Sequence, residues 1–133
     1  MGAQAAEQRR IEAEISSLVD SAAAGDFSRR LSTEDKTGFM LRLSQGINQI
    51  VGTVQTGLDE VIGVVGAMAE GNLSRRMIKQ YEGAFARLKT DLNQTAEQLD
   101  EIVSAIVFAA HSVGTGVQEI ATGNSDLAGR TEE

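Results

Sequence analysis

The sequence predicts an all-α protein: two stacked parallel four-helix coiled-coil bundles formed by a homodimer, with helix–connector–helix repeats in each copy. Three observations support this fold class. Proline, which would interrupt long helices, is absent. A pattern of about 45 residues occurs twice. Apolar residues also recur at alternating steps of three and four, which is a heptad seam, at Met40, Leu43, Ile47, Ile50, Val54, Gly57, Val61, Val64 and Met68.

That seam implies a partner helix. A helix over residues 40–68 would be a rod of about 40 Å, with an apolar stripe too narrow for the buried helix of a small globule. Aromatic residues make up 4% of the 133 residues, which disfavours a compact monomeric core built on large rings. Met40 and Met68 are interpreted as ordinary core methionines rather than adaptable switch contacts.

Charge and composition exclude several classes of function. The formal net charge of −7 argues against nucleic acid as a main partner, because that affinity depends on clustered Lys and Arg. The absence of cysteine excludes disulfides and thiolate metal sites and is compatible with a reducing compartment. We see no run of about 18 apolar residues, and the opening MGAQAAEQRR lacks the apolar centre of a signal peptide. A cytoplasmic location is expected, and a membrane anchor elsewhere in a longer parent stays open.

The first helix is expected from about residue 5 to Ala24, where Gly25 ends it. The stretch GDFSRRLSTEDKTG follows as an ordered connector, held by two hydrophobes four residues apart, Phe27 and Leu31. A second helix is expected from Gly38 to Glu70.

Gly71 repeats the event at Gly25. GNLSRRM at 71–77 matches GDFSRRL at 25–31 with an offset of 46, and GAFARLKTDLNQ at 83–94 matches GFMLRLSQGINQ at 38–49 with an offset of 45. One residue is therefore missing from the second connector. Leu73 and Met77 are its two apolar anchors.

From Phe85 a seam continues to Leu127. One of its registers shrinks to Ala109, Gly116 and Gly123, which predicts that another helix lies close there.

A connector of about 13 residues is too long for a tight hairpin but can return along a 14-residue helix of about 20 Å, so the two helices of a unit can be parallel. Two such helices leave apolar faces in water, whereas two chains supply four helices. The predicted dimer core consists of Ile11, Ile15, Leu18, Leu43, Ile47, Ile50, Val54, Val61, Val64, Met68, Leu88, Leu92, Leu99, Ile102 and Ile106.

The two connectors resemble the connector of HAMP domains: a glycine, one free position, a hydrophobe, three free positions and a second hydrophobe. Asp35-Lys36-Thr37-Gly38 and Glu82-Gly83 are similar to the acidic residue and glycine that open the second HAMP helix. The resemblance implies a tandem array, with a lead-in at 1–10, a first unit at 11–55, a second unit at 57–101 and a following helix at 102–133. The motif residues are Gly25, Phe27, Leu31, Gly71, Leu73 and Met77.

Residues 102–133 resemble the start of the cytoplasmic signalling helix of methyl-accepting chemotaxis proteins. Gln118 to Leu127, followed by Arg130-Thr131-Glu132-Glu133, is similar to the segment just before the first methylation region. This likeness implies that the chemotaxis histidine kinase and its coupling protein contact only a distal tip outside this sequence. It also explains the shrinking register, since the returning helix is absent.

No residue pattern predicts an enzyme, a metal site or a cofactor. His111 is the only histidine, and its neighbours supply no base or acid, so a solvated helix residue is expected. The pairs Arg29-Arg30 and Arg75-Arg76 could contact anionic lipid, but solvated connector residues pairing with nearby acids are the preferred interpretation.

The sequence therefore predicts a signal-relay module of a bacterial chemoreceptor, in which two concatenated HAMP bundles transmit a conformational change to the kinase-control helix. Two alternatives stay open: a HAMP relay from a sensor histidine kinase, and a passive structural dimerisation coiled coil. Helical glycines, each costing about 1 kcal/mol relative to alanine, fit either close packing or a soft two-state helix; they are Gly46, Gly52, Gly57, Gly63 and Gly66.

Overall fold

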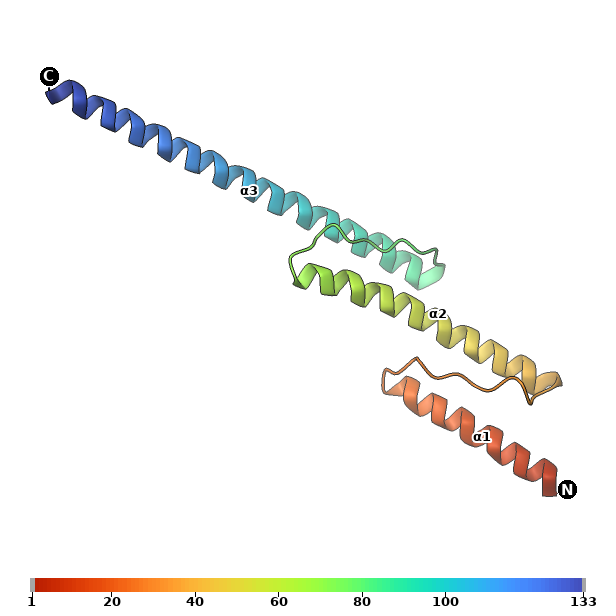
Figure 1. The fold of residues 1–133 in the computed structure, drawn as a ribbon. Coiled ribbons are helices and arrows are strands. Elements are labelled where there is room, and N and C mark those ends of the chain that lie inside the picture. The colour runs from red at the N-terminus through yellow and green to blue at the C-terminus, as the bar shows by residue number, and fades with distance from the viewer. Residues whose placement is uncertain (1, 133) are drawn as a thin grey trace. The chain divides into compact units, whose positions relative to one another are not determined.

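A computed structural model of the chain describes residues 2–132, and these form three helices and no strand. Helix α1 spans Gly2–Ala23, α2 spans Gly38–Ala69 and α3 spans Gly83–Glu132 (Figure 1). Met1 and Glu133 lie outside the described residues, as do the side chains from Arg130 onward. The all-helical prediction is confirmed.

The predicted helix ends agree with the structure to within one residue, apart from the start of α1. That helix begins at Gly2 rather than near residue 5, because Ala3, Ala5 and Ala6 are strong helix formers. Helix α2 ends at Ala69, one residue before the predicted end. Helix α3 continues through the segment after residue 102.

The chain divides into two compact units, one ending at Gly63 and the other beginning at Val64. The domain bounds at residues 55 and 57 stay a prediction, because α2 runs through them without a break.

In the first unit, the connector between α1 and α2 returns along both helices (Figure 1). Its contacts with α1 run in reverse order, from Arg29 with Ser17 to Asp35 with Arg10. Those with α2 also run in reverse, from Arg30 with Gln55 to Leu31 with Asn48. A connector antiparallel to both helices makes the two helices parallel to each other, as the sequence predicted.

The core of the first unit forms where connector and helices meet. Leu18 of α1, Leu31 of the connector and Val51 of α2 are buried together, and Ile15, Phe27 and Ile47 pack against them. The connector therefore supplies a central residue of this core rather than merely linking two helices.

The second unit has the same arrangement of buried positions. Val64, Met77 and Ala96 are all buried. They match Leu18, Leu31 and Val51 through the repeat offsets of 46 and 45. The connector again runs antiparallel to the helix that follows it, because Arg76 contacts Glu97 while Met77 contacts Asn93. The internal repeat in the sequence is thus a repeat in structure.

Candidate functional site

The connectors carry most of the polar structure in this protein, and each begins with the same helix ending. The N–H of Gly25 donates to the Ala22 carbonyl at 3.0 Å and the N–H of Asp26 donates to the Ser21 carbonyl at 2.8 Å. Gly71 and Asn72 make the matching pair of bonds, with the same two lengths. This is the Schellman ending, which places one residue in the left-handed region. The φ angles of Gly25 and Gly71 are 90° and 89°, so the expected unusual dihedrals are present at both glycines.

The residue after each glycine folds the chain into a local turn. Asp26 accepts hydrogen bonds from the Ser28 N–H at 3.0 Å and the Ser28 hydroxyl at 2.5 Å. Asn72 does the same for Ser74, at 3.0 and 2.6 Å. These bonds stabilise the charged carboxylate, and the Ser28 hydroxyl is the main reason why the pKa of Asp26 lies below its ordinary value. Asn72 has no such charge.

One asparagine from the following helix holds each connector at its second hydrophobe. Leu31 N–H donates to Asn48 Oδ1 at 2.7 Å, and Asn48 Nδ2 donates to the Leu31 carbonyl at 2.9 Å. Met77 and Asn93 form the same pair of bonds at 2.8 and 3.0 Å. We call these pairs the first and second connector clamps. Each satisfies both backbone groups of a buried residue that has no strand beside it.

An arginine follows the same course in both connectors. The Arg30 guanidinium donates to the Phe27 and Arg29 carbonyls at 2.7 and 2.8 Å. Arg76 donates to the Leu73 and Arg75 carbonyls. The far end of each guanidinium then contacts the following helix, at Gln55 in the first unit and Glu97 in the second. These arginines are therefore part of the connector structure.

Further charged contacts join the first connector to α1. Lys36 is buried, with 5% of its surface exposed, and its Nζ lies 3.3 Å from a carboxylate oxygen of Glu14 and contacts the Ser32 carbonyl. Glu14 also accepts from the Ser32 N–H at 3.1 Å. Burial of an ammonium group is tolerated because it is paired.

Arg10 and Asp35 form a second tie to α1. Asp35 accepts from Arg10 and, at 3.0 Å, from the Ser32 hydroxyl. The Arg10 hydrogen bond is the main cause that lowers the pKa of Asp35, and the same bond raises the pKa of Arg10. Asp35 is one of the acidic residues singled out in the sequence.

A glycine with positive φ opens each following helix: Gly38 and Gly83 both have a φ of 58°. These are the glycines that resembled the start of the second HAMP helix. Both have a side-chain-free backbone in a region that L residues rarely adopt.

The predicted dimer-core residues differ in exposure within the single chain. Three are buried: Ile11, Leu18 and Val64. Seven are partly buried: Ile15, Leu43, Ile47, Val54, Val61, Met68 and Leu92. Five are exposed: Ile50, Leu88, Leu99, Ile102 and Ile106. Of the motif residues, Leu31 and Met77 are buried, Phe27 and Leu73 are partly buried, and Gly25 and Gly71 are exposed.

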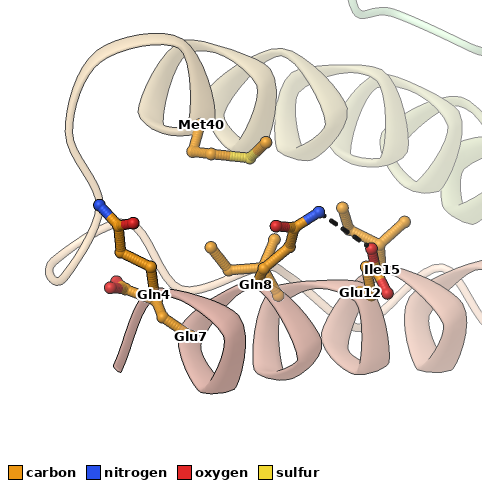
Figure 2. A pocket seen from close by; sticks show the side chains of 7 residues that line it. Gln4, Glu7, Gln8, Glu12, Ile15 and Met40 are labelled. Carbon is orange, nitrogen blue, oxygen red and sulfur yellow. Dashed lines mark hydrogen bonds between the residues drawn. The ribbon is translucent and has the colours of Figure 1, made fainter. Parts of the chain in front are cut away.

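A groove of about 360 Å³ lies on the seam at the N-terminal end of the first unit. Figure 2 shows Met40 of α2 facing α1, with Ile15 and the polar side chains Gln4, Glu7, Gln8 and Glu12 around the space. Gln8 donates to Glu12 at 3.4 Å. The groove follows the seam residues Ile11 and Ile15, so it belongs to the predicted dimer surface.

The residues weighed for chemistry are not brought together. His111 is exposed on α3, and the part of the chain that the structure describes holds no group of three or more His, Asp or Glu placed to bind a metal. Arg29 donates to the Ser17 hydroxyl at 2.7 Å, and Arg75 is exposed.

Helix α2 is long and apolar enough to cross a membrane by length and composition, with 17% of its most apolar window buried. It is the one such helix among the described residues. The sequence analysis expected none. The test considers only length and mean hydropathy, and core helices of soluble proteins pass it too.

Asn48, Asn93, Lys36 and Glu14 were missed as site residues in the sequence analysis. A signal for the asparagines was present, because Asn-Gln ends both copies of the repeated helix start. Glu14 and Lys36 carry no comparable signal, since they lie 22 residues apart and pair only after the connector folds back.

The matched helix endings, connector clamps and opening glycines define a helix–connector–helix signalling module. Residues 35–101 match the HAMP domain family, and this chain belongs to it. Over 109 residues, 82% of its length, the chain is 43% identical to the methyl-accepting chemotaxis protein McpB of Pseudomonas aeruginosa. It spans 16% of that relative's length. Family and relative together support a role in signal relay.

Proposed function

We propose that this chain is the relay segment of a bacterial chemoreceptor, in which two HAMP units in series pass a conformational change to the signalling helix. The observation that carries the proposal is the second connector clamp. It reproduces the first bond for bond, at a sequence offset of 46 for the connector and 45 for the asparagine. A single matched motif could arise alone, but a repeated helix ending, turn, clamp and opening glycine support a second complete unit.

Each unit is proposed to form a parallel four-helix bundle with a second copy of the chain. The exposed seam supports this, since Ile50 and Ile106 leave 65% and 62% of their surface in solvent although they continue the apolar stripe. Burial of such a stripe is the main gain available to a helix of this pattern. The second copy would lie over the groove at Met40.

A second copy, rather than lipid, is proposed to cover α2. The helix carries Asn48 and Gln55, which bond the connector, and it also carries the acidic pair Asp59 and Glu60. A membrane would place these polar groups in hydrocarbon at a cost of several kcal/mol. The proposed location is the cytoplasm.

The proposed relay is not an enzyme. It would act on a chemotaxis histidine kinase and its coupling protein through a distal tip outside this sequence. Helix α2 ends one unit and begins the next, so a packing change in the first bundle would pass through it to the second.

Cysteine cross-linking tests the dimer and its direction. The chain has no native cysteine, so Ile50→Cys introduces a single reactive site. A parallel in-register pair should oxidise to a disulfide-linked dimer. Asp59→Cys is the matched control, because it is exposed and lies nine residues, about two and a half turns, further along α2 on the opposite face. Efficient linking at both positions or at neither, or a single-chain mass in sedimentation at micromolar concentration, would contradict the dimer.

Switching is tested in the full-length receptor. Cross-linking at Ile50 and at Val61 should differ between the signal-on and signal-off forms. If both proximities are the same in the two forms, the relay proposal fails and a passive rod is favoured. Gly57→Leu gives an independent measure, since a bulky side chain in the seam should alter receptor output, whereas a passive rod would tolerate it.

A further inference from the structure

The two arginines that end the connector turns contact different chemistry on the following helix. Arg76 Nη2 lies 3.0 Å from Glu97 Oε2, whereas Arg30 Nη2 donates to the neutral Gln55 amide oxygen at 2.7 Å. Through the offset of 45, Glu97 matches Gly52, which has no side chain. The first guanidinium lies over that glycine, and a Cβ there would be 3.6 Å from Arg30 Nη2. The arginines are therefore matched in position but not in their partners.

The charge difference extends over one helical turn. Asp100 of α3 matches Gln55 of α2, so two acids stand where the first unit has a glycine and an amide. The Arg76 side chain is only 22% exposed, while Glu97 is 61% exposed. A second cation acts nearby, because Lys89 Nζ donates to the Lys79 carbonyl at 2.9 Å. In the first unit, Ser44 occupies the position of Lys89.

From this geometry we infer that Glu97 is a positioning residue that fastens the second connector to α3 through Arg76, and that Gly52 leaves the first connector more loosely held to α2. The inference concerns one chain and does not depend on the proposed relay. Within that relay, it means that the second connector moves with α3 whereas the first can part from α2.

Amide hydrogen exchange measures this fastening directly. The Leu31 and Met77 N–H groups donate to the clamp asparagines at 2.7 and 2.8 Å, so each amide exchanges only when its connector opens. NMR exchange rates on the protein should show that Glu97→Gln speeds Met77 exchange about two- to fivefold, the range of a partly exposed ion pair. Leu31 exchange should stay unchanged.

Asp100→Asn is the matched control for charge. It removes an acid one turn further along without removing the partner of Arg76, and should leave Met77 exchange nearly unchanged. High salt should speed Met77 exchange in the native chain and have no further effect in Glu97→Gln, which a purely structural role for Glu97 would not produce.

The reverse substitution builds the missing ion pair in the first unit. Gly52→Glu should slow Leu31 exchange about two- to fivefold relative to Gly52→Gln, because both replace a helical glycine but only one adds charge. Equal rates for these two variants would overturn the inference. So would a Met77 amide that is insensitive to both Glu97→Gln and salt.

Discussion

The two connectors follow the same backbone course with different side chains around it. Leu31 and Met77 occupy the same buried place, and both are clamped by an asparagine. The helix residues beside them differ, because Leu18 and Val51 of the first unit become the smaller Val64 and Ala96. The comparison teaches that backbone hydrogen bonds fix the connector course, while the volume of the hydrophobic core varies between units.

Charged contacts are the most variable part. In the first unit a connector lysine, Lys36, reaches the Ser32 carbonyl. In the second unit the lysine belongs to the helix, where Lys89 reaches the Lys79 carbonyl. A carbonyl of the connector receives an ammonium group in both units, but from opposite sides. The position of the charge therefore matters more than the residue that supplies it.

Removal of the buried connector side chain gives the largest expected effect and tests the difference in core volume. Leu31→Ala and Met77→Ala should each cost about 2–5 kcal/mol of unfolding free energy. Met77→Ala should lie at the lower end, because its smaller neighbours provide fewer contacts. Chemical denaturation with amide exchange in each unit measures both. A larger cost for Met77→Ala would show that the second core is the more tightly packed.

Loss of the clamp should affect both units equally. Asn48→Ala and Asn93→Ala each leave a backbone N–H and a carbonyl without their partner, at a cost of about 2–3 kcal/mol. Asn→Asp at either site is the control, since it keeps the acceptor for the N–H and loses only the donor. It should cost about half as much. Unequal losses for Asn48→Ala and Asn93→Ala would break the equivalence of the two clamps.

The glycines that end α1 and α2 should also behave alike. Gly25→Ala and Gly71→Ala force a Cβ into the left-handed region, at a cost of about 1–2 kcal/mol. No atom lies within 4 Å of the position that a Cβ would take at either glycine, so backbone strain alone decides the result. Gly46→Ala, inside α2 with equally open surroundings, should instead stabilise the protein by about 0.5–1 kcal/mol. Thermal unfolding distinguishes the two signs.

Acidification should distinguish the two connector turns, with the smallest effect. Because the folded-state pKa of Asp26 is lowered, its contribution is present above the unfolded pKa of about 4 and is lost as the pH falls through the folded value. Asn72 does not titrate. Exchange near Ser28 should therefore rise at low pH, after correction for intrinsic rates, while exchange near Ser74 stays constant. Asp26→Asn should remove the difference, and a persisting difference would exclude Asp26 as its source.

The sequence alone predicted the three helices, their ends and the repeat, because each depends on local information. Gly25 and Gly71 follow apolar periodic runs, and two hydrophobes at fixed spacing mark each connector. Asn48 and Asn93 could not be placed, since an asparagine in a helix has no partner until a distant segment returns to it. The ion pair of Lys36 with Glu14 was missed for the same reason. The twofold bundle stays a prediction, because it depends on a second chain.

The clamp also determines where the connector can change length. Leu31 follows Gly25 by six residues, as Met77 follows Gly71, whereas the next glycine follows seven residues after Leu31 and six after Met77. All the length variation between the two copies therefore falls after the clamped residue. An insertion before that residue would turn the neighbouring anchor away from the core, while one after it need only lengthen a surface bend. Tolerance to insertions and deletions in this family of modules should thus be one-sided, confined to the stretch that leads into the next helix.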